Sequence, residues 1–120
     1  MLSITKKFEF EAAHQLSPRE VFGKCADVHG HTYKLEIEVT ADSKMNGMIM
    51  NFSDLSKIVK ENIIELVDHK FLNAVFERPT TAEEMVEAFR DIINAHLPTK
   101  IELIRIRLYE TSNSFAQWIK

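Results

Sequence analysis

Cysteine, glycine and proline are all scarce in this chain of 120 residues. Its single cysteine, Cys25, excludes an intrachain disulfide and any zinc site built from several thiolates. With only 3 glycines and 3 prolines, the composition is that of a globular protein rather than a collagen-like or disordered chain. Since disulfides are the mark of oxidising compartments, a chain that cannot form one is expected in the cytoplasm.

Long apolar runs and an excess of basic residues are missing as well. No run approaches the roughly 20 apolar residues that a bilayer span requires, and the N-terminal segment lacks the pattern of a signal peptide. The 15 basic residues are outnumbered by 18 acidic ones, for a net charge of −3, which argues against binding to a nucleic acid backbone. We expect residues 1–120 to form a single domain, because two halves would each be too small to bury a good core.

What the sequence does contain is a clear alternation of apolar and polar residues in several segments, which predicts β-strands. The alternating segments are 2–14, 29–40 and 101–110, and shorter strands are expected at 48–50 and 114–119. The dipeptide Asn46-Gly47 predicts a tight turn before residues 48–50.

Two later segments have apolar residues at helical spacing. The first predicted helix runs from Asp54 to about Asp68, with Ser53 as its N-cap. The second begins at the capping-box pattern 81–84, continues to about Leu97 and is closed by Pro98. The sequence therefore predicts an α+β fold in which two helices cover one face of a four-stranded antiparallel sheet.

The two faces of this predicted sheet differ in chemistry. In the last long strand, the residues expected on the helix-covered face are Ile104, Ile106, Leu108 and Glu110. The opposite face carries charges of both signs, at Lys7, Glu9, Glu11, Lys34, Glu36, Glu38, Arg105 and Arg107. Such a face is either solvated or the polar inner wall of a barrel made by several sheets joined edge to edge.

Three histidines are predicted to converge at one end of the sheet. His29 and His31 point the same way in a strand, and antiparallel pairing of the first two strands would bring His14 beside them. Three imidazoles with an open fourth position match a catalytic zinc site, and nitrogen ligands favour zinc over calcium or magnesium. The alternative is three unrelated surface histidines.

Four further residues carry chemistry that suits a site. Cys25, four residues before His29, is a fourth metal ligand, a thiolate base or nucleophile, or simple packing. Asp68 and His69 could relay protons from the turn after the first helix, although a helix C-terminus also favours histidine. Glu110 is expected on the covered face, where a ligand with two adjacent N–H donors would satisfy its carboxylate. The alternative is that Glu110 frays outward at the strand end.

Five segments of the chain together resemble the 6-pyruvoyl-tetrahydropterin synthase / 6-carboxy-tetrahydropterin synthase family. The segments are Phe10 to His14, Cys25 to Tyr33, Asp68 to Asn73, Thr81 to Glu83 and Tyr109 to Thr111. The resemblance implies the tunnelling fold (T-fold), in which three subunits close a barrel and two trimers stack into a homohexamer with active sites at subunit interfaces.

The resemblance also implies an activity and a role for each residue. His14, His29 and His31 would bind Zn²⁺. Cys25 would be the catalytic base, with Asp68 and His69 as its relay, while Glu110 would anchor the pterin ring and Thr81 would support it. The implied enzyme is a zinc-dependent lyase of queuosine biosynthesis. It would convert 7,8-dihydroneopterin triphosphate to 6-carboxy-5,6,7,8-tetrahydropterin and release acetaldehyde and triphosphate, with no nucleic acid or membrane partner.

Other activities remain open within and outside this family. The three residues between Cys25 and His29 fit the carboxy branch, whereas Lys24 and the segment 68–73 resemble the pyruvoyl branch about as well. A third, dihydroneopterin-cleaving branch has Glu where this chain has Ala26. Outside the enzymes, the alternative is a non-catalytic binding or assembly module stabilised by zinc.

Overall fold

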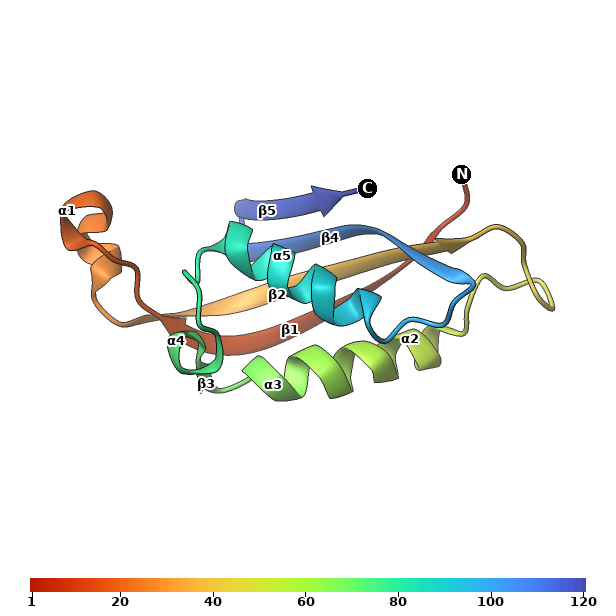
Figure 1. Ribbon diagram of the computed structural model, residues 1–120, viewed down its shortest axis with the longest axis horizontal. Coiled ribbons are helices and arrows are strands. Elements are labelled where there is room, and N and C mark those ends of the chain that lie inside the picture. Colours follow the sequence, from red (N-terminus) through yellow and green to blue (C-terminus); the bar gives the residue numbers. More distant parts are fainter.

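A computed structural model describes residues 1–120. One five-stranded sheet forms the body of the protein (Figure 1). The strands are β1 (Ile4–His14), β2 (His29–Ala41), β3 (Lys70–Phe71), β4 (Ile101–Thr111) and β5 (Ser114–Ile119), and their order in the sheet is β3-β1-β2-β4-β5. Every pairing is antiparallel except that of β1 with β3, which is parallel.

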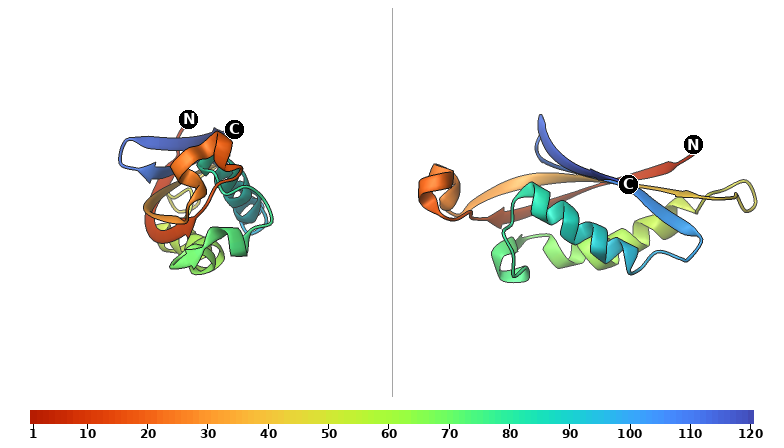
Figure 2. Two further views of the ribbon diagram at one scale, coloured as in Figure 1. Left: turned by 90° about the vertical axis from the view of Figure 1, so that its left-hand side faces the viewer. Right: turned by 45° about the horizontal axis from the view of Figure 1, so that its top comes forward.

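The longer helices lie on one side of this sheet (Figure 2). The helical segments are α1 (Arg19–Phe22), the 3₁₀ turn η1 (Gly23–Ala26), α2 (Phe52–Val59), the π-helical η2 (Lys60–Ile64), α3 (Glu65–Val67), α4 (Leu72–Val75) and α5 (Ala82–Asn94). None of these helices has the length and apolar character needed to cross a membrane.

The core lies between the sheet and its helices. Strand alternation places Phe8, Phe10 and Ala12 of β1 on the same face as Tyr33 and the following apolar residues of β2, and α5 packs against them through a stripe that includes Phe89. A cluster of 20 buried hydrophobic residues results. Full burial of one such side chain contributes about 2 kcal/mol relative to exposure, so this packing is what holds the helices on the sheet.

The α+β class is confirmed, but the prediction of four strands was wrong by one. Lys70 and Phe71 add a two-residue strand, parallel to Ala12 and Ala13 at the outer edge of β1. A segment of two residues has no alternation that could reveal it.

Residues 48–50 do not form the predicted strand. The Asn46-Gly47 turn is present, with positive φ at both residues, and it is closed by two backbone hydrogen bonds between Met45 and Met48. The pairing ends there, and the chain passes directly into α2.

Helix boundaries differ from the prediction in two places. The N-cap of α2 is Asn51 rather than Ser53, since the Asn51 side chain accepts a hydrogen bond from the Ser53 N–H. The segment that follows is helical as predicted, but five of its residues, 60–64, form a π turn. α5 ends at Asn94, so His96 lies in the turn beyond it.

A β-bulge in β4 places Leu103, rather than the predicted Ile104, on the helix-covered face. The register shifts so that Glu38 pairs with Arg105 and Val39 with Leu103, which leaves Ile104 unpaired between them. Leu103 is therefore buried in place of Ile104, while Ile106 and Leu108 take their predicted positions in the core.

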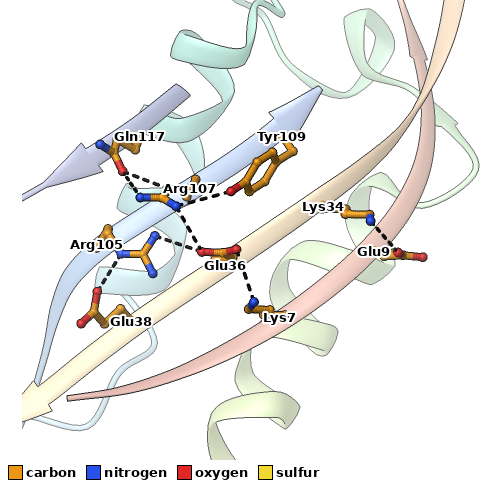
Figure 3. Close-up of polar contacts among 9 residues, drawn as sticks. All are labelled: Lys7, Glu9, Lys34, Glu36, Glu38, Arg105, Arg107, Tyr109 and Gln117. Carbon is orange, nitrogen blue, oxygen red and sulfur yellow. Dashed lines mark hydrogen bonds and ion pairs between the residues drawn. The ribbon is translucent and has the colours of Figure 1, made fainter. Parts of the chain in front are cut away.

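The sheet face opposite the helices carries a network of charges across three strands (Figure 3). Arg105 donates from Nε to Glu38 at 2.7 Å and from Nη1 to Glu36 at 3.1 Å. Arg107 donates to Gln117 of β5, and Lys7 of β1 lies 3.9 Å from Glu36. The charges predicted on this face are thus paired with charges on neighbouring strands, except Glu11, whose carboxylate accepts from the Thr32 hydroxyl.

Candidate active site

Three imidazoles converge where β1 ends and β2 begins. His14 is paired with His29 in the register of the two strands, and His31 follows two residues later on the same face. Their ring centroids are 4.5 to 5.3 Å apart. One potential ligand atom from each residue lies within 4.8 Å of the other two.

Backbone carbonyls orient two of these rings. His14 Nδ1 donates to the carbonyl oxygen of Thr80 at 2.8 Å, and His29 Nδ1 donates to that of Asp27 at 2.8 Å. Because a carbonyl can only accept, Nδ1 carries the proton in both neutral rings. Nε2 is then left with its lone pair free, as in metal-binding histidines.

The buried nitrogens of the cluster fit a metal ion. His14 Nε2 and His31 Nε2 are buried and have no hydrogen-bond partner, an arrangement that is costly unless a ligand satisfies the atoms. Burial lowers the pKa of His14, although the Thr80 carbonyl acts in the opposite direction. The neutral ring that binds metal is therefore favoured, and an all-nitrogen donor set suits zinc.

Glu110 and Tyr33 border the histidine cluster. The Glu110 carboxylate lies 3.5 Å from His31 Nε2 and 4.0 Å from His14 Nε2, so it does face the helix-covered side, as predicted. These distances are long for hydrogen bonds, and the carboxylate retains free acceptors. The hydroxyl of Tyr33 is buried without a partner. Burial raises the pKa of Tyr33, and the negative charge of nearby Glu110 raises it further by a smaller amount.

Asp68 and His69 lie at the β1 edge. Asp68 Oδ1 accepts from the Glu11 N–H at 2.9 Å, and the N–H of His69, which has a positive φ, donates to the Glu11 carbonyl. The imidazole of His69 is exposed, with Nε2 3.9 Å from Asp68 Oδ2. His69 and His31 both line a groove of about 580 Å³ together with residues of the charged sheet face. Of the predicted relay pair, His69 therefore shares this groove with His31, whereas Asp68 does not line it.

Cys25 and Thr81 occupy different surroundings. Cys25 is exposed in η1, on the segment that projects beyond the sheet (Figure 1), and its carbonyl accepts from the N–H of Leu16. It is not among the residues that line the groove of His31 and His69. The Thr81 hydroxyl is the N-cap of α5 and accepts from the Glu84 N–H at 3.2 Å, as the capping-box pattern predicts.

Two residues bonded to or near His14 have no predicted role. Thr80 is buried and supplies the carbonyl that orients His14. Asn73 bonds both to Thr80 and to the backbone of Gln15. Asn73 lies within one of the family-like segments, but its contacts join distant parts of the chain, and no local pattern signals them.

Together, the fold and the cluster define a T-fold protein with a candidate three-histidine metal centre. The family model described as 6-pyruvoyl tetrahydropterin synthase matches residues 3–119. The chain is 35% identical to a 6-carboxy-5,6,7,8-tetrahydropterin synthase of Haemophilus influenzae, over 98% of this chain and 99% of that protein. The chain therefore belongs to the 6-pyruvoyl tetrahydropterin synthase family.

Other similar proteins carry the 6-pyruvoyl name. The human 6-pyruvoyl tetrahydrobiopterin synthase is 28% identical over 92% of this chain and 86% of its own length. Among solved structures, the Caenorhabditis elegans 6-pyruvoyl tetrahydropterin synthase superposes with a TM-score of 0.87 at 21% identity, covering 99% of this chain and 95% of that one. The structural likeness confirms the T-fold.

Proposed function

We propose that the protein is a zinc-dependent lyase that converts 7,8-dihydroneopterin triphosphate and one water molecule to 6-carboxy-5,6,7,8-tetrahydropterin, acetaldehyde and triphosphate. The observation that carries the proposal is the set of buried, unpartnered Nε2 atoms of His14 and His31 beside His29. The spacing of Cys25 from His29 and the 35% identity to the H. influenzae carboxy enzyme favour this product, one used in queuosine biosynthesis.

The residues of the cluster would hold the ion and orient the substrate. His14, His29 and His31 would bind Zn²⁺, which when bound supplies Lewis-acid activation of the side-chain hydroxyls of the substrate. Glu110, which has free acceptors, would accept two N–H groups from the pterin ring edge. This contact sets the register of the ring and so places the reacting carbons, with Thr81 as a supporting contact.

Proton transfer would fall to Cys25 and the relay pair. The Cys25 thiolate would remove a proton from the substrate side chain next to the ring, and His69, oriented by Asp68, would move protons on and off. Cys25 lies on a projecting segment outside the groove of His69. We therefore place the complete site at a subunit boundary of a trimeric barrel, two of which would stack into a hexamer.

The first test is the product itself. Purified protein loaded with Zn²⁺ and incubated with dihydroneopterin triphosphate should yield 6-carboxytetrahydropterin and acetaldehyde by mass spectrometry. A 6-pyruvoyl product would instead assign the chain to the activity named for its human relative. No turnover with zinc bound would favour the non-catalytic module.

Matched variants test the assigned roles. Cys25→Ala should abolish turnover, a loss of at least about 100-fold, and should keep its zinc. If Cys25→Ala loses zinc, the thiolate closes a structural four-ligand site. His29→Ala should lose zinc, whereas His96→Ala, which removes a histidine bonded only to the Ile92 carbonyl outside the site, should keep both zinc and activity.

A further inference from the structure

We propose that Asn73 is a positioning residue that fixes the His14 imidazole for metal binding, acting through Gln15 and Thr80. The proposal rests on the proposed function only in that a metal ion occupies the histidine cluster. Asn73 itself touches none of the three imidazoles.

One amide group joins two separate segments of the chain. Asn73 Oδ1 accepts from the Gln15 N–H at 3.0 Å and from the Thr80 hydroxyl at 3.2 Å. Asn73 Nδ2 donates to the Gln15 carbonyl at 3.0 Å. Only a side chain with both a donor and an acceptor can make these three bonds together, and an asparagine amide has both.

The first segment fixes the backbone of His14. The β1–β2 ladder ends at the pair of His14 with His29, so Gln15 has no partner in that ladder. The two bonds from Asn73 hold the Gln15 peptide where the strand would otherwise fray. His14 is thus anchored on the side that the sheet leaves free.

The second segment fixes the ring of His14. The Thr80 carbonyl accepts from His14 Nδ1 at 2.8 Å, and Thr80 is almost fully buried. The Thr80 hydroxyl, 3.4 Å from the same nitrogen, is bonded to Asn73. Asn73 therefore holds the residue that sets the tautomer of His14 and the direction of its Nε2, the function of outer-shell groups at metal sites.

Zinc affinity tests the proposal directly. We expect Asn73→Ala and Thr80→Val to bind Zn²⁺ about 10-fold more weakly than the parent protein, in competition with a chromophoric chelator. Thr80→Ser, which keeps the hydroxyl, should bind as tightly as the parent. Asn62→Ala is the matched control, since Asn62 is also half-buried and donates to a backbone carbonyl, that of Ile58, away from the site. It should leave zinc affinity unchanged.

Imidazole nitrogen resonances in the zinc-free protein provide a second readout that general loosening of the fold would not move. The parent and Asn62→Ala should show His14 as a single Nδ1–H tautomer, and Asn73→Ala and Thr80→Val should show a mixture. Parent-like zinc affinity and a single tautomer in both of these variants would overturn the proposal, as would an equal loss in Asn62→Ala or Thr80→Ser. If the parent takes up no zinc, the metal centre is wrong, and the tautomer measurement still decides the role of Asn73.

Discussion

At the scale of single residues, polar groups that lack partners inside the chain lie together where β1 ends and β2 begins. His14 Nε2, His31 Nε2 and the Tyr33 hydroxyl are the buried side-chain atoms without a hydrogen bond. All three belong to neighbouring residues of one sheet face, and the Tyr33 ring lies 5.5 Å from that of His31. Unsatisfied groups that gather in one place indicate a ligand site rather than scattered packing faults.

Replacement of Tyr33 by Phe should stabilise the ligand-free protein. The change removes a buried hydroxyl that has no partner and keeps the ring stacked on Phe10 at 4.8 Å. We expect the free energy of unfolding in denaturant to rise by about 1 kcal/mol. The control is Tyr109→Phe, because the Tyr109 hydroxyl accepts from Arg107 and should not gain stability when removed. A loss of stability in Tyr33→Phe would show that its hydroxyl is satisfied in solution.

At the scale of elements, α2 shows how a helix start is chosen between two good candidates. Asn51 and Ser53 both belong to the residue types that cap helices, but the Asn51 side chain accepts from the Ser53 N–H at 2.9 Å, which makes Asn51 the cap. Asn51→Ala should lower the free energy of unfolding by about 1 kcal/mol, and Ser53→Ala should lower it by clearly less. Thermal or denaturant unfolding of the two variants measures this difference, and the reverse order would restore Ser53 as the cap.

The cross-strand network between β2 and β4 makes stability depend on pH. Hydrogen bonds from Ser3 and then Arg105 lower the pKa of Glu38 from its ordinary value of 4.5. Burial disfavours the charged guanidinium of Arg105, but the hydrogen bonds to Glu38 and Glu36 outweigh it and raise its pKa. The folded state therefore favours the ionised pair.

A carboxyl group whose pKa is lower in the folded state stabilises the fold fully above its unfolded pKa and loses this contribution as the pH falls through the folded value. The free energy of unfolding should accordingly decrease below about pH 4.5, and Glu38→Gln should be less stable than the parent at pH 7. The difference in free energy of unfolding between the parent and Glu38→Gln should narrow as the pH falls from 7 to 3. Glu77→Gln, which removes an exposed carboxylate outside the network, should show no such convergence. A gap that stays constant with pH would contradict this account.

Elements with a clear periodicity of apolar residues were predictable from the sequence, whereas features set by contacts between distant residues were not. Alternation in β1 and β2, with antiparallel pairing, was enough to bring His14 beside His29 and His31. The bulge that replaces Ile104 by Leu103 in the core depends on pairing with β2 and leaves no mark in the alternation. The contact of Thr80 with His14 joins residues 66 positions apart.

At the scale of the whole molecule, the chain has surfaces that suit neighbours of its own kind. The charged face carries no helices, and its ions are paired among themselves rather than with another element (Figure 3). Both edges of the sheet are largely open, because β3 covers only Ala12 and Ala13 of β1, and β5 pairs on one side only. Long bare edges are usually paired or protected in natural proteins.

Assembly through these edges would form the barrel that the family resemblance implies and would place the paired charges on its inner wall. We expect native mass spectrometry to find a species of six times the 13.9 kDa chain mass, with trimers on partial dissociation. Hydrogen exchange should then show protection of amides along Ile4–Phe10 and along β5 that have no hydrogen bond within one chain, because a neighbouring subunit would bond them. A 13.9 kDa species with fast exchange at both edges would rule the barrel out. The groove of His69 would then have to obtain its thiol from the same chain, which requires the projecting segment of Cys25 to fold back by a large movement.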